Sequence, residues 1–259
     1  MKQVAVLLAA ASLTGCATHG APSGALSSYD GLQKQEGSMR TGVSQRIDQT
    51  RLRGVRSVSL PPAVLADTPS TRWLSAEERR NLLAEIDAQI CFELSERYEI
   101  TAHGGAADAH VRAVVTRVSP TGRAASALSA ASGFLIPGPV GLRVPGTIGG
   151  LGAEAEMILA DGVQASALIW NRNATPIGTD KPSMSRIGDA MQFAEPFGDA
   201  VASTMAKDKP RIKNTQGDPC ARHGPRLRAA NWLAGAATGL YVPPGARKAG
   251  DEDKRGAKQ

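Results

Sequence analysis

The chain contains few aromatic residues, few cysteines and no recognisable catalytic motif. Aromatic side chains make up only 4% of the 259 residues, so a core has to be built mainly from alanine, valine, leucine and isoleucine. The apolar run at residues 4–11 is too short for a membrane-spanning helix, which needs about 20 residues. A Gly-x-Ser-x-Gly nucleophile elbow and a phosphate-binding loop are both absent, so neither motif assigns an enzymatic activity.

The first sixteen residues resemble a bacterial lipoprotein signal. Lys2 supplies a positive start, residues 4–11 form an uncharged apolar core, and residues 13–16 (Leu-Thr-Gly-Cys) match a lipobox. The resemblance implies cleavage after Gly15 and acylation of both the thiol and the new amino group of Cys16, which gives stable membrane anchoring. The alternative is an ordinary secretory signal that contains a chance cysteine.

Export to the envelope bears on the other cysteines. In such lipoproteins the residue after the cysteine influences sorting, and Ala17 in place of aspartate favours the periplasmic face of the outer membrane. Disulfides persist in the oxidising compartment that export implies. Once Cys16 is acylated, Cys91 and Cys220 remain, and the sequence leaves open whether they form a disulfide or stay as two thiols.

The net charge of +6 is unevenly distributed along the chain. Residues 16–206 carry 17 basic and 19 acidic residues, whereas residues 207–259 carry 12 and 5. The folded part is therefore near neutral, and the basic excess lies in the C-terminal tail. In the envelope this tail is expected to contact anionic lipid or peptidoglycan, and export argues against nucleic acid as a partner.

Composition divides the chain into four parts. The segment after Cys16 is rich in Gly, Ser, Thr and Gln and predicts a tether, in which residues 27–32 carry the apolar side chains that could dock on the domain. The predicted parts are a signal peptide (1–15), a lipidated tether (16–50), an α+β domain (51–206) and a basic, largely disordered tail (207–259).

Two helices are predicted in the domain. Ser75 and Glu78 form a capping-box pattern that begins a helix over residues 75–97, where apolar residues recur at helical spacing. A second apolar stripe predicts a helix over residues 187–205. Proline disrupts the interior of a helix, so this one is expected to kink or break near Pro196.

Four strands are predicted. Residues 55–60 are β-prone and end at a proline pair, and residues 109–118 alternate between apolar and polar side chains. Residues 153–160 and 163–170 flank Asp161-Gly162, which predicts a hairpin with a two-residue type I′ turn.

Regular pairing across that turn would place Glu156 opposite Ala167 and Ile158 opposite Ala165. Before the hairpin, residues 124–152 are low in charge and rich in Gly, Ala, Ser and Pro. They predict a long apolar loop, which either contacts a partner or packs on the sheet as a crossover.

The predicted fold is α+β, with an antiparallel or mixed sheet of four or more strands and two helices on one face. The order of elements resembles bacterial lipoproteins of the DUF3313 family over about residues 25–206. The resemblance is carried by residues 26–32, by 111–118 and by 153–156 leading into the Asp161-Gly162 turn. It implies no assigned activity and therefore no catalytic residues.

Two clusters of polar residues are candidates for chemistry. His103, Asp108 and His110 lie close in sequence, but their spacing fits no regular metal site, so no metal is predicted. Glu154 and Glu156 lie on one face of a strand, where acid–base catalysis would require one of them to be desolvated. The alternative for the two glutamates is a solvated polar stripe.

These observations together predict a non-enzymatic cell-envelope lipoprotein that acts as an accessory or interaction module. The expected contacts are the membrane through lipid on Cys16, a protein partner through the 124–152 loop, and anionic lipid or peptidoglycan through the tail. No cofactor is expected. The alternatives are an enzyme acting on an envelope polymer and a module that carries lipid.

Overall fold

The structure is a computed structural model of the whole chain. It describes residues 20–36, 40–101, 105–122, 141–142, 148–175, 177–178, 180–213, 217–226, 233, 238 and 240–244.

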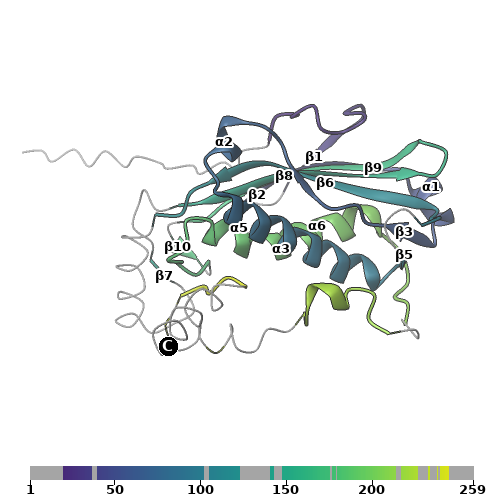
Figure 1. The fold of residues 1–259 in the computed structure, drawn as a ribbon. Coiled ribbons are helices and arrows are strands. Elements are labelled where there is room, and N and C mark those ends of the chain that lie inside the picture. Colours follow the sequence, from purple (N-terminus) through teal and green to yellow (C-terminus); the bar gives the residue numbers. More distant parts are fainter. Residues whose placement is uncertain are drawn as a thin grey trace, which may run out of the picture.

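Eight of the described strands form one mixed sheet, in the order β1-β2-β9-β8-β6-β3-β5, with β4 also paired to β6 (Figure 1). Contacts of β3 with β5 and β6, and of β4 with β6, are parallel, and the other pairs are antiparallel. These strands are β1 Gln33–Gln35, β2 Thr41–Ile47, β3 Ser57–Ser59, β4 Val64–Leu65, β5 Glu99–Thr101, β6 Ala109–Ser119, β8 Gly150–Leu159 and β9 Gln164–Asn173. A separate pair joins β7 (Gly141–Leu142) to β10 (Ile177–Gly178). The predicted α+β class with a mixed sheet is confirmed.

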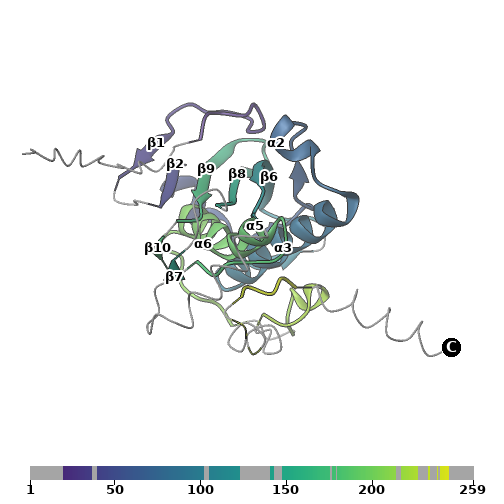
Figure 2. The ribbon, with the colours of Figure 1, turned by 90° about the vertical axis from the view of Figure 1, so that its left-hand side faces the viewer.

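Helices cover one face of this sheet, as Figures 1 and 2 show. The described helices are α1 Gln49–Gly54, α2 Pro69–Arg72, α3 Ala76–Ser95, α5 Gly188–Gln192, α6 Ala194–Met205 and the short 3-10 helix η1 Ala221–His223. Helices α3, α5 and α6 pack beneath the sheet, where Trp170 of β9 meets Phe197 of α6 with ring centroids 5.7 Å apart. Ala153 and Ala155 lie at the centre of the side of β8 that faces the helices, between Leu151 and Met157, so the helices can approach closely there.

Helix α3 begins where its capping box predicts. The Ser75 hydroxyl accepts a hydrogen bond from the Glu78 backbone N–H at 3.2 Å, and the Glu78 carboxylate accepts one from the Ser75 N–H at 2.9 Å. These bonds satisfy donors that a helix start leaves unpaired. The predicted stripe is buried at Ile86, Ile90 and Leu94.

The predicted break in the second helix occurs at Phe193, between α5 and α6. Pro196 lies in the first turn of α6, where its missing N–H costs nothing because that position has no helical acceptor. Gly198 lets α6 approach α3 closely: a Cβ there would come within 3.0 Å of the Gln89 backbone carbonyl.

The hairpin between β8 and β9 is confirmed, but its turn is not type I′. Gly162 has φ +85° and Asp161 does not have a positive φ, whereas a type I′ turn needs both. The Gly162 N–H donates to the Leu159 carbonyl and the Leu159 N–H to that of Val163, each at 2.9 Å, so the loop has three residues.

A register shift follows this longer turn. Glu156 lies opposite Ala167 as predicted, but Gln164, not Ala165, lies opposite Ile158. The irregularity falls at Ala165, which has no partner in the register. Consequently Gln164 shares the face of Glu156 and not the face that packs on the helices.

The predicted tether at residues 16–50 is too long. Residues 41–47 form β2, which pairs with β9 along its whole length, and residues 20–32 pack on the sheet. Composition missed β2 because only Val43 and Ile47 are large apolar residues, and the strand is stabilised by backbone pairing.

The predicted end of the apolar loop also changes. Gly150 and Gly152, assigned to the apolar loop, belong to β8, where side chains would collide with Asn173 and Asn171. Of the 124–152 loop, only residues 141–142 and 148–152 are among the described residues.

Part of the tail predicted to be disordered is packed on the domain. The Ile212 N–H donates to the Glu96 carbonyl at 2.9 Å, and the Tyr241 N–H donates to the Pro182 carbonyl at 2.8 Å. Cys220, which also lies in the tail, is completely buried. Contacts made far along the chain therefore order segments that their composition predicts to be loose.

Candidate functional site

The outer face of the sheet, opposite the helices, is covered by residues 20–32, which we call the N-terminal strap. In Figure 1 the strap is the purple loop above the sheet, and Figure 2 shows it on the side away from α3 and α6. Leu26 is 7% exposed and packs with Ala167 and Ile169 of β9. As a result, β8 is buried on both faces. In a sheet with one solvated face, every second side chain of such a strand would be exposed.

Glu156 lies beneath the strap and is its main point of attachment. Its side chain is only 1% exposed. One carboxylate oxygen accepts hydrogen bonds from the Ser27 N–H at 2.9 Å, the Ser27 hydroxyl at 2.6 Å and the Gln164 amide at 2.5 Å. The other oxygen accepts from the Arg112 guanidinium, with 2.8 Å between Nε and Oε1. Four donors from three segments thus converge on one carboxylate.

Glu154 makes the matching attachment two residues earlier. Its carboxylate accepts hydrogen bonds from the Ser23 N–H at 2.8 Å and from the Tyr29 hydroxyl at 2.6 Å. The Tyr29 hydroxyl also accepts from the backbone N–H groups of Gly24 and Leu26, at 2.8 and 3.1 Å. The glutamates are therefore neither a solvated stripe nor an open catalytic pair: they are buried acceptors for the strap.

The pKa of Glu156 reflects this environment. Burial opposes ionisation and would raise the pKa, but the hydrogen bonds from Ser27, Gln164 and Arg112 outweigh it and hold the pKa below the usual value. The carboxylate is ionised at neutral pH. A general acid needs the opposite shift, so the electrostatics favour a structural role.

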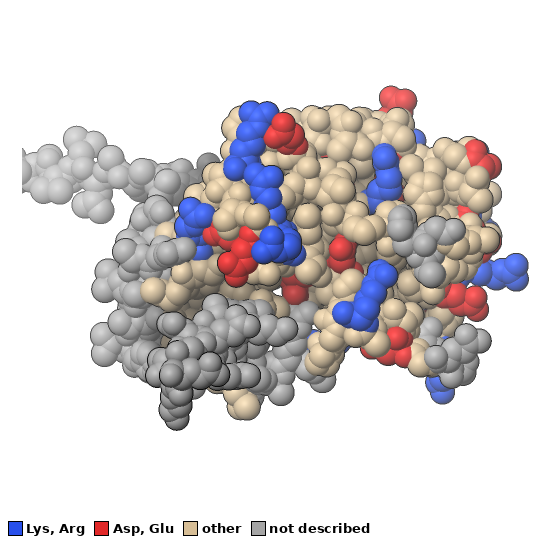
Figure 3. All heavy atoms as spheres, in the orientation of Figure 1, with Lys and Arg blue, Asp and Glu red and all other residues tan. Residues whose placement is uncertain are grey.

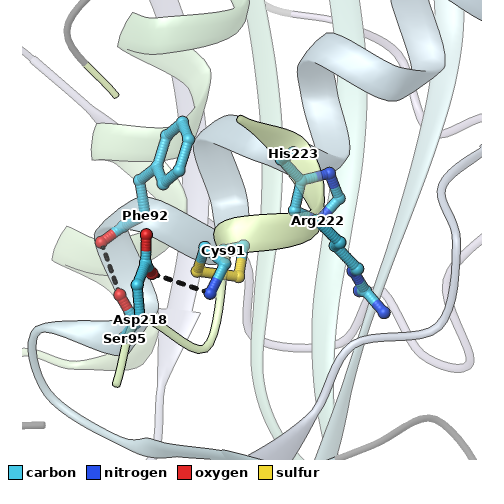
Figure 4. The surroundings of a disulfide bond; sticks show 7 residues. Cys91, Phe92, Ser95, Asp218, Arg222 and His223 are labelled. Atoms are coloured by element: carbon cyan, nitrogen blue, oxygen red, sulfur yellow. Dashed lines mark hydrogen bonds between the residues drawn. A yellow bond between two sulfur atoms is a disulfide. The ribbon is translucent and has the colours of Figure 1, made fainter. Parts of the chain in front are cut away.

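The sequence candidates for modification and crosslinking have separate outcomes. Cys16 lies outside the described residues, so its lipidation stays a prediction. Cys91 of α3 and Cys220 are joined, with an S–S distance of 2.01 Å and their Cα atoms 5.9 Å apart. Figure 4 shows this bond beside Asp218, whose carboxylate accepts from the Cys220 N–H at 2.8 Å. The disulfide attaches η1 and the neighbouring part of the tail to the C-terminal part of α3.

The histidine cluster does not come together as a metal site in the described residues, where no group of three metal-ligating side chains occurs. Asp108 instead accepts hydrogen bonds from the Arg56 and Ser57 N–H groups, at 2.8 and 2.9 Å, which lower its pKa and join the approaches to β6 and β3. His110 lies within β6, opposite Ile158. His103 lies outside the described residues.

A basic cleft of about 1210 Å³ opens between α1, β5 and the start of the tail. Its lining has six cationic and three acidic side chains over an aliphatic floor. The cations are Arg53, Arg56, Arg97, Lys207, Lys209 and Lys213, the acids Glu99, Asp208 and Asp218, and the floor residues include Leu52, Val55, Ile100 and Ile212. The described start of the tail therefore forms one wall of a cavity whose composition suits an anionic ligand with an aliphatic part.

Lys209 positions that wall. Its ammonium group donates to the carbonyl of Arg53 at 3.2 Å and to that of Val55, and it lies 5.2 Å from the centre of the Tyr98 ring. Burial lowers its pKa. Arg97 donates in turn to the Lys209 carbonyl. These two cations are used within the fold, whereas Arg56, Lys207 and Lys213 are exposed at the cleft.

The cleft and the start of the strap lie at opposite ends of the sheet. Gly20 packs against Asn171, which pairs with Gly42 at the beginning of β2. The cleft begins at Gln49, just after β2 ends at Ile47. On the face that Figure 3 shows, basic and acidic side chains lie beside one another, so the described surface there has no large basic area.

The sequence analysis did not predict the attachment of the strap to Glu154 and Glu156 or the basic cleft. The charge pair between Arg112 and Glu156 was detectable, because correct pairing of β6 with β8 sets the two side chains opposite each other. The docking of the strap had a weaker sequence signal, namely the few apolar side chains within residues 27–32. The basic cleft had no such signal, since its walls come mainly from three segments far apart in sequence, at residues 49–56, 97–101 and 207–213.

Comparison with known proteins identifies a family without an activity. No described helix is both long and apolar enough to cross a membrane, and no curated protein matches the chain significantly. A PelC dodecamer from Paraburkholderia phytofirmans is similar at a TM-score of 0.39 and 12% identity, covering 66% of this chain and 99% of that chain. A variant of the same dodecamer is similar at a TM-score of 0.38 and 11% identity, covering 65% of this chain and 99% of that chain. The family described as "Protein of unknown function (DUF3313)" matches residues 21–201, so the chain belongs to the DUF3313 family.

Proposed function

We propose that this protein is a lipid-anchored, non-enzymatic interaction module of the cell envelope, held at the periplasmic face of the outer membrane. The lipobox at Cys16 supports the anchor. The burial of Glu154 and Glu156 carries the non-enzymatic part of the proposal: these are the carboxylates best placed for catalysis by sequence, and they are 1% and 0% exposed beneath the strap. A substrate has no access to either of them while the strap is bound.

The anchor is tested by replacing the proposed acylated residue. We expect wild-type protein to incorporate labelled palmitate and to fractionate with outer membranes, because two or more acyl chains give stable anchoring. Cys16→Ser should abolish the label and release the protein. Thr18→Ser is the control, since it is a conservative change just outside the lipobox and leaves the Cys91–Cys220 disulfide intact. Palmitate incorporation that persists in Cys16→Ser would remove the anchor from the proposal.

The basic cleft supports the interaction role. Its exposed cations include Arg56 and Lys213, and together with the aliphatic residues of the lining they can take an anionic group of the envelope. The predicted contact of the 124–152 loop with a protein partner lies largely outside the described residues and stays a separate prediction.

We expect the double variant Arg56→Glu/Lys213→Glu to bind anionic targets about tenfold more weakly, which corresponds to about 1.4 kcal/mol. Binding is measured by co-sedimentation with isolated peptidoglycan and, in a separate experiment, with phosphatidylglycerol vesicles. The material that sediments wild-type protein identifies whether the anionic ligand is peptidoglycan or lipid. Arg80→Glu, on the exposed side of α3, changes charge away from the cleft and is the control. Equal binding by the double variant and this control would exclude the cleft.

A further inference from the structure

The strap connects the proposed lipid anchor directly to the body of the domain. Ser23 and Ser27 donate to the buried glutamates of β8, and Leu26 is packed on β9. Before them, Gly20 lies so close to β9 that a Cβ would come within 3.1 Å of the Ile169 side chain. The chain is thus attached to the sheet from Gly20 onward, and it is not a free tether.

Only three residues separate Cys16 from the first of these contacts. A fully extended chain spans at most about 3.6 Å per residue, so the Cα atoms of Cys16 and Gly20 can be at most about 14 Å apart. Acyl chains on Cys16 hold that residue at the bilayer surface. The end of the sheet at Gly20 and Asn171 must therefore lie within about the same distance of the lipid headgroups.

We propose that this end of the sheet, where β2 begins and β9 ends, is the membrane-facing surface of the protein. The partner is the lipid bilayer that holds Cys16, so the inference rests on the proposed anchor. Strand β9 rises about 3.3 Å per residue, which separates Asn173 from Gln164 by about 30 Å. The basic cleft, which begins at Gln49 beyond the other end of β2, is therefore distant from this membrane.

Photo-crosslinking tests the orientation in a form that does not depend on acylation in the cell. The mature chain, beginning at Cys16, is coupled through the Cys16 thiol to a maleimide phospholipid in vesicles of phosphatidylethanolamine and phosphatidylglycerol. Benzoylphenylalanine replaces either Asn173, exposed at the near end, or Lys213, exposed in the cleft. The readout is the fraction of protein crosslinked to lipid.

We expect the Asn173 position to crosslink to lipid at least about fivefold more than the Lys213 position, because tethering raises the effective concentration of lipid only at the near end. A Gly/Ser spacer of about 20 residues inserted between Thr18 and His19 should bring the Asn173 position down to the level of Lys213. Equal crosslinking without the spacer, or an Asn173 signal that the spacer leaves unchanged, overturns the inference. Failure of the anchor itself is scored separately, by palmitate labelling of Cys16→Ser.

Discussion

Replacing Glu156 with glutamine is expected to lower the free energy of unfolding by about 2–3 kcal/mol and to release the strap. The substitution keeps the size of the side chain but removes the charge that Ser27, Gln164 and Arg112 share. Hydrogen bonds to charged groups contribute about 1.5–3 kcal/mol, and a buried donor left unpaired adds its own cost. Arg112 is 44% exposed and can be hydrated again, which limits the loss.

Thermal unfolding and hydrogen exchange measure the two parts of this prediction. For a domain of this size the melting temperature should fall by about 5–10 °C, and amides of residues 20–32 should exchange faster. Glu36→Gln, an exposed carboxylate beyond β1, is the matched control. A variant with unchanged melting temperature and unchanged exchange in the strap would show that Glu156 does not hold it.

The effect of Glu156→Gln should also depend on pH. A carboxyl whose folded-state pKa lies below its unfolded value, 4.5 for Glu, stabilises the fold above that value. This stabilisation is lost as the pH falls through the folded-state pKa. The difference in melting temperature between wild type and variant should therefore be full at neutral pH and shrink progressively below about pH 4.5.

Removing the disulfide is expected to have the largest effect on global stability. Cys91 and Cys220 are 129 residues apart in sequence, and closing a loop of that length contributes about 5 kcal/mol in the chain-entropy model. The double variant Cys91→Ala/Cys220→Ala should melt about 10 °C below the oxidised wild type. Both sulfurs are completely buried, so the alanines also leave space unfilled.

The tail should respond locally to the same variant. Without the disulfide, residues 217–226 keep the pairs that Arg226 makes with Glu93 and Glu96, and these exposed pairs contribute little. Trypsin should therefore cut at Arg222 and Arg226 much earlier in the variant. A reducing agent provides the control, because it should lower the melting temperature of the wild type and not that of the variant. Equal melting of the variant and the oxidised wild type would contradict the prediction.

Local patterns predicted the regular elements well. The capping box at Ser75 depends on bonds within four residues, so α3 begins where the sequence places it. The Asp161-Gly162 signal located the hairpin for the same reason. Its turn type was wrong. Its register was right at Glu156, opposite Ala167, but wrong at Ile158, because a shift next to the turn moves Gln164 to the other face.

The sequence by itself determined the proposed anchor at Cys16, the helices, the hairpin and the near-neutral charge of the domain, since each depends on neighbouring residues. Only the tertiary structure decided what Glu154 and Glu156 do, because their partners lie more than a hundred residues away in the strap and burial reverses their expected role. It also joined Cys91 to Cys220. Residues 20–32, predicted to belong to a tether, are attached to the sheet, because their backbone and hydroxyl donors meet carboxylates that only the folded sheet presents.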